Sequence, residues 1–199
     1  MRRFVKLLIG VVAVMVAGCA IYIHTHPLVF NESFWGHAHC IKGSGLALET
    51  YARDHHGRFP YHTNGYGDAL LLMTNEVGSW WASVTGPGYD EKPFLEALRA
   101  GSHLSEQACG RVYVQGLSES DNPDIVLLFD KLPTPGGDHC HFLRRLSAPL
   151  AREVWTIGGC PRTVTESRWS EFARRQIDLL TAAGTPRKDA EKLYAADVP

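Results

Sequence analysis

A helical seam that ends in Gly-Arg-Phe-Pro constrains this chain most, because it predicts both one amphipathic helix and the place where that helix stops. Gly57 can adopt a left-handed end and Pro60 cannot continue a helix, so we expect the helix to end near residues 55–57. Asn31 or Ser33 is expected to cap its start. Small and apolar side chains recur at alternating spacings of four and three residues, at Phe34, Ala38, Ile41, Gly45, Leu48 and Ala52. The pattern predicts a spine helix with one narrow buried face and with Lys42, Glu49, Arg53 and Asp54 turned away from it.

The N-terminal segment predicts a membrane tether. Arg2, Arg3 and Lys6 precede an uncharged, mostly apolar run from Leu7 to Ile23, which is about the length that crosses a bilayer core. Cations before such a run favour a cytoplasmic N-terminus. We therefore expect residues 1–26 to be a membrane anchor or signal segment and residues 27–199 to form an extracytoplasmic domain.

A lipoprotein signal is the alternative for the same segment. Val16-Ala17-Gly18-Cys19 has small residues before a cysteine, as lipoprotein processing requires, so Cys19 is a candidate for lipidation. The apolar run continues past Cys19 to Ile23, which favours the uncleaved anchor. In both cases the rest of the chain is tethered outside the cytoplasm.

Charge and length limit the classes of function. The 20 Lys and Arg residues nearly balance the 21 Asp and Glu residues, and no basic stripe with interleaved aromatic residues is present. Nucleic acid is therefore excluded as an expected partner. With 199 residues, the chain has room for one domain beyond the anchor.

Four cysteines remain once Cys19 is set aside, namely Cys40, Cys109, Cys140 and Cys160. Disulfides persist outside the cytoplasm, so two bridges are the simplest interpretation. Three pairings are possible and the sequence does not choose among them. We favour Cys40 with Cys109 and Cys140 with Cys160, because the first bridge would tie the spine to a sheet.

Downstream of the spine, the periodicity predicts short helices followed by strands. Helices are expected at residues 68–73 and 93–100, and strands at residues 111–115, 125–129, 153–157 and 162–165. Gly158-Gly159 favours a tight hairpin between the last two strands. A C-terminal amphipathic helix with Ser167 as its cap, and a last helix from Pro186 to Ala195, complete the pattern. The predicted fold class is α+β, with the spine helix packed on an antiparallel sheet of three or four strands.

Clusters of histidine and cysteine raise a metal site or a hydrolase as alternatives. His37, His39, His139 and His141, with Cys109 or Cys160, could supply four ligands to zinc, but their spacings match no common zinc framework. A Cys-His hydrolase could pair Cys140 with His55, His62 or His139, yet no nucleophile motif surrounds any cysteine. We therefore expect no cofactor, no metal and no catalysis, with disulfides beside exposed histidines.

Two adjacent tryptophans are candidates for a partner contact. Trp80 and Trp81 lie in a segment rich in turn residues, and adjacent side chains cannot easily both point into a core. One of them is then available to another protein.

Several short motifs, in a fixed order, carry a resemblance to a known family. The spine runs through Gly45-Leu46-Ala47-Leu48 to Gly57-Arg58-Phe59-Pro60. The later motifs are Cys109, Tyr113, Gly116-Leu117, Asn122-Pro123, the run from Ile125 to Phe129, Gly136-Gly137 and the Gly158-Gly159 hairpin. This order resembles that of bacterial type II secretion pseudopilin-like proteins, over roughly residues 37–165. The chain lacks their cleavage motif, and no calcium ligands can be carried over residue by residue.

The resemblance implies a structural or interaction protein of the bacterial cell envelope, linked to type II secretion. Its expected partners are the bacterial inner membrane, through the N-terminal segment, and other envelope or secretion proteins. A lipoprotein with a His/Cys metal site, acting in metal binding or hydrolysis, is the alternative function.

Overall fold

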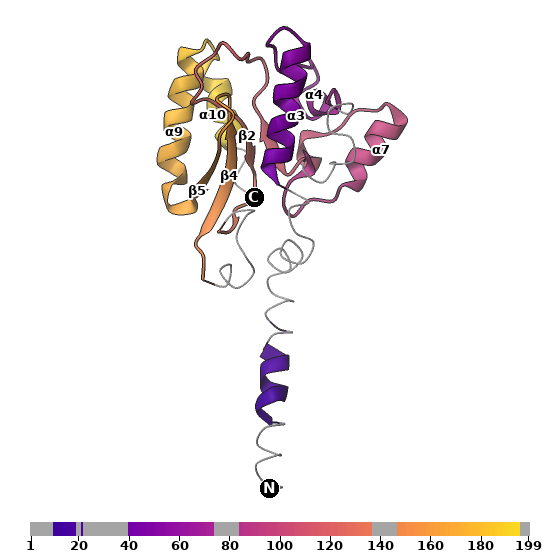
Figure 1. Cartoon of the computed structure of the whole chain (residues 1–199), viewed down its shortest axis with the longest axis vertical. Helices are drawn as coiled ribbons and strands as arrows, with labels where there is room; N and C mark the ends of the chain where they lie inside the picture. The colour runs from indigo at the N-terminus through magenta and orange to yellow at the C-terminus, as the bar shows by residue number, and fades with distance from the viewer. Residues whose placement is uncertain (1–9, 19–20, 22–39, 74–83, 137–146, 196–199) are drawn as a thin grey trace.

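The computed structural model describes residues 10–18, 21, 40–73, 84–136 and 147–195, and it shows an α+β fold (Figure 1). The helices are α3 (Ile41–Asp54), α4 (Tyr66–Leu71), α7 (Lys92–Ala100), the 3₁₀ helix η1 (Glu106–Ala108), α9 (Glu166–Ala182) and α10 (Arg187–Ala195). The strands are β1 (Arg111–Tyr113), β2 (Val126–Asp130), β3 (Thr134–Pro135), β4 (Leu150–Thr156) and β5 (Pro161–Thr165). The predicted α+β class is confirmed.

Helix α3 is the predicted spine, and its end lies where the sequence indicates. The last turn closes through a hydrogen bond from Gly57 N to the carbonyl of Ala52 (2.7 Å), with Gly57 at φ +77°. Ile41, Gly45, Leu48 and Ala52 of the seam are all buried. The apolar spacing therefore identified the buried face correctly.

The start of the spine differs from the prediction. Cys40 has an extended backbone (φ −62°, ψ 121°) and is the N-cap of α3, so the helix does not run unbroken from Phe34 to Ala52. Ile41, the first helical residue, is also fully buried. Helix α3 thus begins at a residue that is packed in the core, and the expected caps Asn31 and Ser33 lie outside the described residues.

The strands form one antiparallel sheet in the order β1-β2-β4-β3, with β5 paired to β4. Strand β4 is the longest. It pairs with β2 at residues 154–156, with β3 at residues 150–151 and with β5 at residues 151–155. The described residues contain five strands where three or four were expected, and the strand that was not predicted is the short β3 (Thr134–Pro135), which pairs with β4. The predicted β4–β5 hairpin is confirmed, and Gly159 in its turn has φ +72°.

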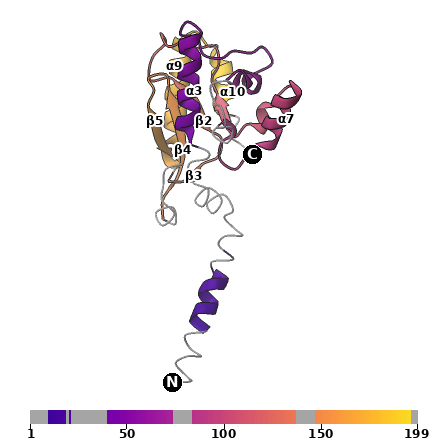
Figure 2. The same cartoon turned by 45° about the vertical axis from the view of Figure 1, so that its right-hand side comes forward.

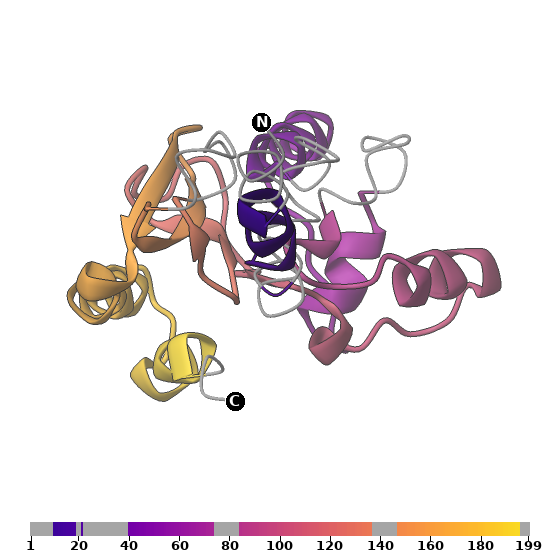
Figure 3. The same cartoon turned by 90° about the horizontal axis from the view of Figure 1, so that it is seen from below.

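Helices cover both faces of the sheet (Figures 2 and 3). On one face α3 lies so close that a Cβ placed on Gly45 would be 2.1 Å from the Trp155 ring. On the other face Phe129 of β2 stacks on Tyr194 of α10 at 4.8 Å and contacts Trp169 of α9 at 5.4 Å. Aromatic packing of this kind holds the three layers together.

Strand β1 is buried along its whole length and includes a charged residue. Arg111 is fully buried, and its Nε donates to Asp130 Oδ1 at 2.8 Å. Arg111 also donates to Ser44 Oγ of α3 at 3.4 Å. The buried guanidinium of Arg111 is therefore part of the contact between α3 and the sheet.

The C-terminal helices match the prediction closely. Thr165, the last residue of β5, is the N-cap of α9 in place of the expected Ser167. The apolar stripe of α9 buries Trp169, Ala173 and Leu180. Because β5 leads directly into α9, strand and helix are joined without a loop.

Residues 10–18 form a helical segment set apart from the domain (Figure 1). Its large apolar side chains are exposed, with Val14 at 73%, Met15 at 64% and Val16 at 63%. In the part of the chain that the structure describes, no helix combines the length and the apolar character needed to cross a membrane.

Candidate functional site

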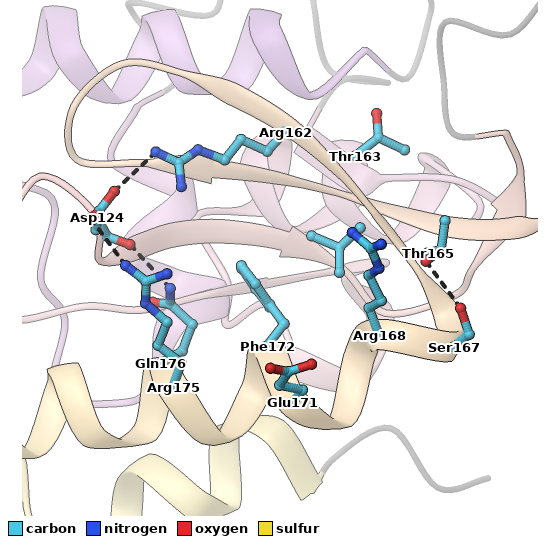
Figure 4. Close-up of a pocket in the computed structure, with 11 residues that line it drawn as sticks. Asp124, Arg162, Thr163, Thr165, Ser167, Arg168, Glu171, Phe172, Arg175 and Gln176 are labelled. Atoms are coloured by element: carbon cyan, nitrogen blue, oxygen red, sulfur yellow. Dashed lines mark hydrogen bonds and ion pairs between the residues drawn. The ribbon is translucent and has the colours of Figure 1, made fainter.

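The main candidate site is a groove between β5 and the first half of α9, which we call the β5–α9 groove (Figure 4). Its volume is about 600 Å³. Strand β5 supplies Arg162, Thr163, Val164 and Thr165, and the remaining lining residues are Asp124, Ser167, Arg168, Glu171, Phe172, Arg175 and Gln176. The groove exists because the chain turns from β5 into α9 without a connecting loop.

Asp124 lies at one end of the groove and holds two arginines. Its Oδ1 accepts a hydrogen bond from Arg162 Nη2 at 2.9 Å, and its Oδ2 one from Arg175 Nη2 at 3.4 Å (Figure 4). The Asn122-Pro123 turn positions Asp124, whose backbone N–H donates to Asn122 Oδ1 at 3.0 Å. One carboxylate therefore faces two guanidinium groups, so this end of the groove keeps a surplus of positive charge.

Gln176 fixes this end of the groove to the sheet. Its side chain is buried, accepts from the backbone N–H of Val126 at 3.0 Å and donates to the carbonyl of Asp124 at 3.1 Å. The side-chain amide of Gln176 thus satisfies one backbone donor and one backbone acceptor at the start of β2. These two hydrogen bonds fix the position of α9 relative to β2.

Arg168 lies toward the other end, where Thr165 Oγ1 and Ser167 Oγ are 3.2 Å apart. Figure 4 shows its side chain rising from α9 toward β5. Among the described residues Arg168 has no ion-pair partner. Half-buried Val164 and Phe172 form an apolar floor.

The groove is suited to binding more than to bond-breaking chemistry. Its lining residues include three arginines and three hydroxyl side chains but no histidine and no cysteine. Guanidinium groups bind carboxylates and phosphates through paired hydrogen bonds. The arrangement can therefore hold an anionic group above an apolar floor.

A second polar cluster surrounds Asp68 of α4. Asp68 Oδ2 lies 2.8 Å from His103 Nδ1 and accepts from Asn64 Nδ2 at 3.0 Å, while Oδ1 accepts from the backbone N–H of Leu104 at 2.7 Å. Burial alone would raise the pKa of Asp68, but the hydrogen bonds from His103, Leu104 and Asn64 together lower that pKa to about 2. The carboxylate therefore holds α4 to the segment before η1.

Glu49 was expected on the solvated side of the spine, and this prediction was wrong. Glu49 is half-buried beside the β4–β5 turn, where its Oε1 is 2.7 Å from the position a Cβ would take on Gly159. Burial and the nearby negative charge of Glu119 raise the pKa of Glu49. The turn that closes the hairpin thus covers part of the polar face of α3.

The cysteines that the structure describes carry no disulfide. The thiol of buried Cys109 donates to the carbonyl of Ser105 at 3.7 Å, and that of exposed Cys160 to the carbonyl of Gly158 at 3.7 Å. Cys40 is buried at the start of α3. Burial raises the pKa of the Cys109 thiol to about 11, although Lys131 acts in the opposite direction. Cys109 is therefore a protonated, unreactive thiol at neutral pH.

Of the other site residues named from the sequence, His55 lies 2.8 Å from the carbonyl of Tyr51 and His62 lies 3.5 Å from Asp68 Oδ2, and the rest lie outside the described residues. They are Cys19, Cys140, Trp80, Trp81, His37, His39, His139 and His141. Within the described ranges, no three His, Cys, Asp or Glu side chains come together as a metal-binding group.

The β5–α9 groove was not predicted from the sequence. Arg162 falls in a predicted strand, but only the fold shows that it and Arg175 meet at Asp124. A usable signal was present, because Arg168 and Arg175 are two helical turns apart and therefore lie on one face of α9.

Comparison of the chain with protein-family models, curated proteins and solved structures gave no match.

Proposed function

We propose that this protein is a membrane-tethered, non-catalytic interaction protein of the bacterial cell envelope, organised like a pseudopilin. The observation that carries the proposal is the apolar helical segment at residues 10–18, whose side chains are exposed outside the packed domain. Exposed apolar surface on this scale marks a membrane or protein interaction site. Residues 7–23 then act as the anchor, with the N-terminus in the cytoplasm.

The architecture of the domain supports the same proposal. A spine helix packs on an antiparallel sheet, and the motifs of the pseudopilin-like order fall on its elements: Gly57-Arg58-Phe59-Pro60 after α3, Asn122-Pro123 before β2, and Gly158-Gly159 between β4 and β5. In the chain these motifs keep the order on which the resemblance rests.

The first experiment tests the tether. Val14→Lys with Val16→Lys places two ammonium groups in the apolar segment, and each costs roughly 2.5–3.5 kcal/mol near the centre of a spanning helix. We expect the wild-type chain in the membrane fraction of a bacterial host, resistant to carbonate extraction. We expect the double variant to be lost from that fraction.

A matched control separates anchoring from general surface effects. Leu46→Lys with Leu150→Lys changes two exposed apolar residues of the domain, 47% and 49% exposed, and should leave the protein in the membrane. Protease added to spheroplasts should digest the domain of the wild type. Membrane retention of the Val14/Val16 variant, or a protected domain, would contradict the proposal, and loss of retention in Cys19→Ser would replace the spanning anchor by a lipid.

A further inference from the structure

We propose that the β5–α9 groove binds an acidic peptide segment in extended conformation, which adds to the edge of β5 as another strand. The inference goes beyond the proposed function and does not depend on the membrane tether. It combines three features of the groove: a strand edge, an adjacent helical wall and an excess of arginine.

The first feature is the outer edge of β5. Within the described residues β5 pairs with β4 alone. The backbone N–H of Thr156 donates to the carbonyl of Cys160 (3.4 Å), and bonded pairs alternate along an antiparallel ladder. Thr163, opposite Glu153, therefore falls in a non-bonded pair, and its N–H and C=O point away from β4. These groups are the donor and acceptor that an added strand uses.

The second feature is the wall formed by α9. The groove of about 600 Å³ lies between β5 and α9, and half-buried Val164 and Phe172 form its floor. In an added strand, alternate side chains point to one face, so every second residue would face α9. An apolar side chain at the central position fits the floor.

The third feature is charge. The groove has three guanidinium groups and two carboxylates, and Arg162 and Arg175 share the single carboxylate of Asp124. The Arg175 side chain is 66% exposed, so it can turn to a new carboxylate. Charge complementarity therefore selects an acidic occupant.

The spacing of the arginines predicts a sequence pattern. Arg168 and Arg175 are seven residues apart on α9, a rise of about 10 Å. Same-facing positions i and i+4 of a strand are about 13 Å apart, which long arginine side chains can span. The expected motif is acidic-x-apolar-x-acidic, with the apolar residue over Phe172.

The test uses the full-length protein in detergent and the peptide acetyl-Thr-Glu-Thr-Val-Thr-Glu-Thr-amide carrying a fluorophore. We expect saturable binding by anisotropy that weakens with salt, and at least tenfold weaker binding by the lysine analogue of the peptide. Arg168→Gln with Arg175→Gln should weaken binding at least tenfold. Glu171→Gln, which removes a lining carboxylate, should tighten it.

The strand geometry has its own readout. We expect hydrogen exchange to slow over residues 161–165 when the peptide binds, and Thr163→Pro, which removes an outward N–H, to abolish binding while circular dichroism stays unchanged. If Thr163→Pro unfolds the protein, a peptide N-methylated at alternate residues tests the same bonds in the wild type. Equal binding of the lysine peptide, insensitivity to the arginine changes, binding without slowed exchange, or displacement by equimolar inorganic phosphate would each overturn the proposal.

Discussion

At the scale of single residues, Arg111 and Asp130 form a buried ion pair in which neither side chain can be replaced alone without a loss of stability. Both side chains are fully buried, and the Asp130 carboxylate also accepts from the backbone N–H of Glu153 at 3.1 Å. A buried charge that loses its partner is left without compensation. The pair therefore specifies how β1, β2 and β4 align beneath α3.

We predict that Arg111→Met destabilises the protein by about 3–5 kcal/mol, because it leaves the Asp130 carboxylate buried without its cation. Urea unfolding followed by tryptophan fluorescence measures the change. The double variant Arg111→Met with Asp130→Leu should be less destabilised than the two single changes added together. Additive losses would show that the two side chains do not act as a pair.

Asp68 gives the protein an acid-sensitive point. Its pKa is about 2 in the folded protein and near 3.8 in an unfolded chain, so its stabilising contribution is complete above about pH 5 and is lost progressively as the pH falls through 3.8 to below about 2. Asp68→Asn should cost about 2 kcal/mol at pH 7, typical of hydrogen bonds to a charged group.

Urea unfolding of both proteins between pH 7 and pH 2 checks this. The difference in unfolding free energy should be constant down to about pH 5 and shrink below it. Asp121→Asn, a carboxylate in the 118–121 turn, is the control for general acid effects. A difference that does not change with pH would mean that the Asp68 charge is not what holds α4.

At the scale of secondary-structure elements, the contact between α3 and the sheet depends on the absence of one side chain. A Cβ on Gly45 would lie 2.1 Å from Cδ2 and 2.2 Å from Cε2 of Trp155, well inside contact distance for a ring held in the core. We predict that Gly45→Ala destabilises the protein by about 1–3 kcal/mol, because overpacking outweighs the gain in helix propensity.

Thermal unfolding measures this effect. Leu46→Ala, one position away and 47% exposed, should change stability by less than about 0.5 kcal/mol. Trp155→Leu should recover part of the loss when combined with Gly45→Ala. A Gly45→Ala protein as stable as the wild type would mean that α3 can move away from the sheet at no cost.

Most elements could be predicted from sequence because each has a local cause. The end of α3 follows from Gly57, the hairpin from Gly158-Gly159 and the face of α9 from its apolar stripe. The start of α3 at Ile41 and the two-residue β3 have no such local signal, since they depend on which segments meet after folding. Glu49 was misplaced for the same reason.

At the scale of the whole molecule, the α+β class and the packing of a spine helix on an antiparallel sheet could be predicted, but the candidate site could not. The groove depends on Asp124 meeting Arg162 and Arg175, residues 38 and 51 positions away. Charges that far apart give no periodic signal in a single sequence. The residues that the sequence analysis did name as sites were mostly cysteines, histidines and tryptophans, whose chemistry is visible without a fold.

The direct passage from β5 into α9 makes the groove a nearly self-contained unit. All its lining residues except Asp124 belong to one uninterrupted stretch, from Arg162 to Gln176. A single insertion there would shift the edge of β5, the apolar floor and the wall formed by α9 together. The whole stretch can therefore be exchanged or deleted as one segment. During evolution we expect this surface to change by replacement of the segment more readily than by separate substitutions in β5 and α9.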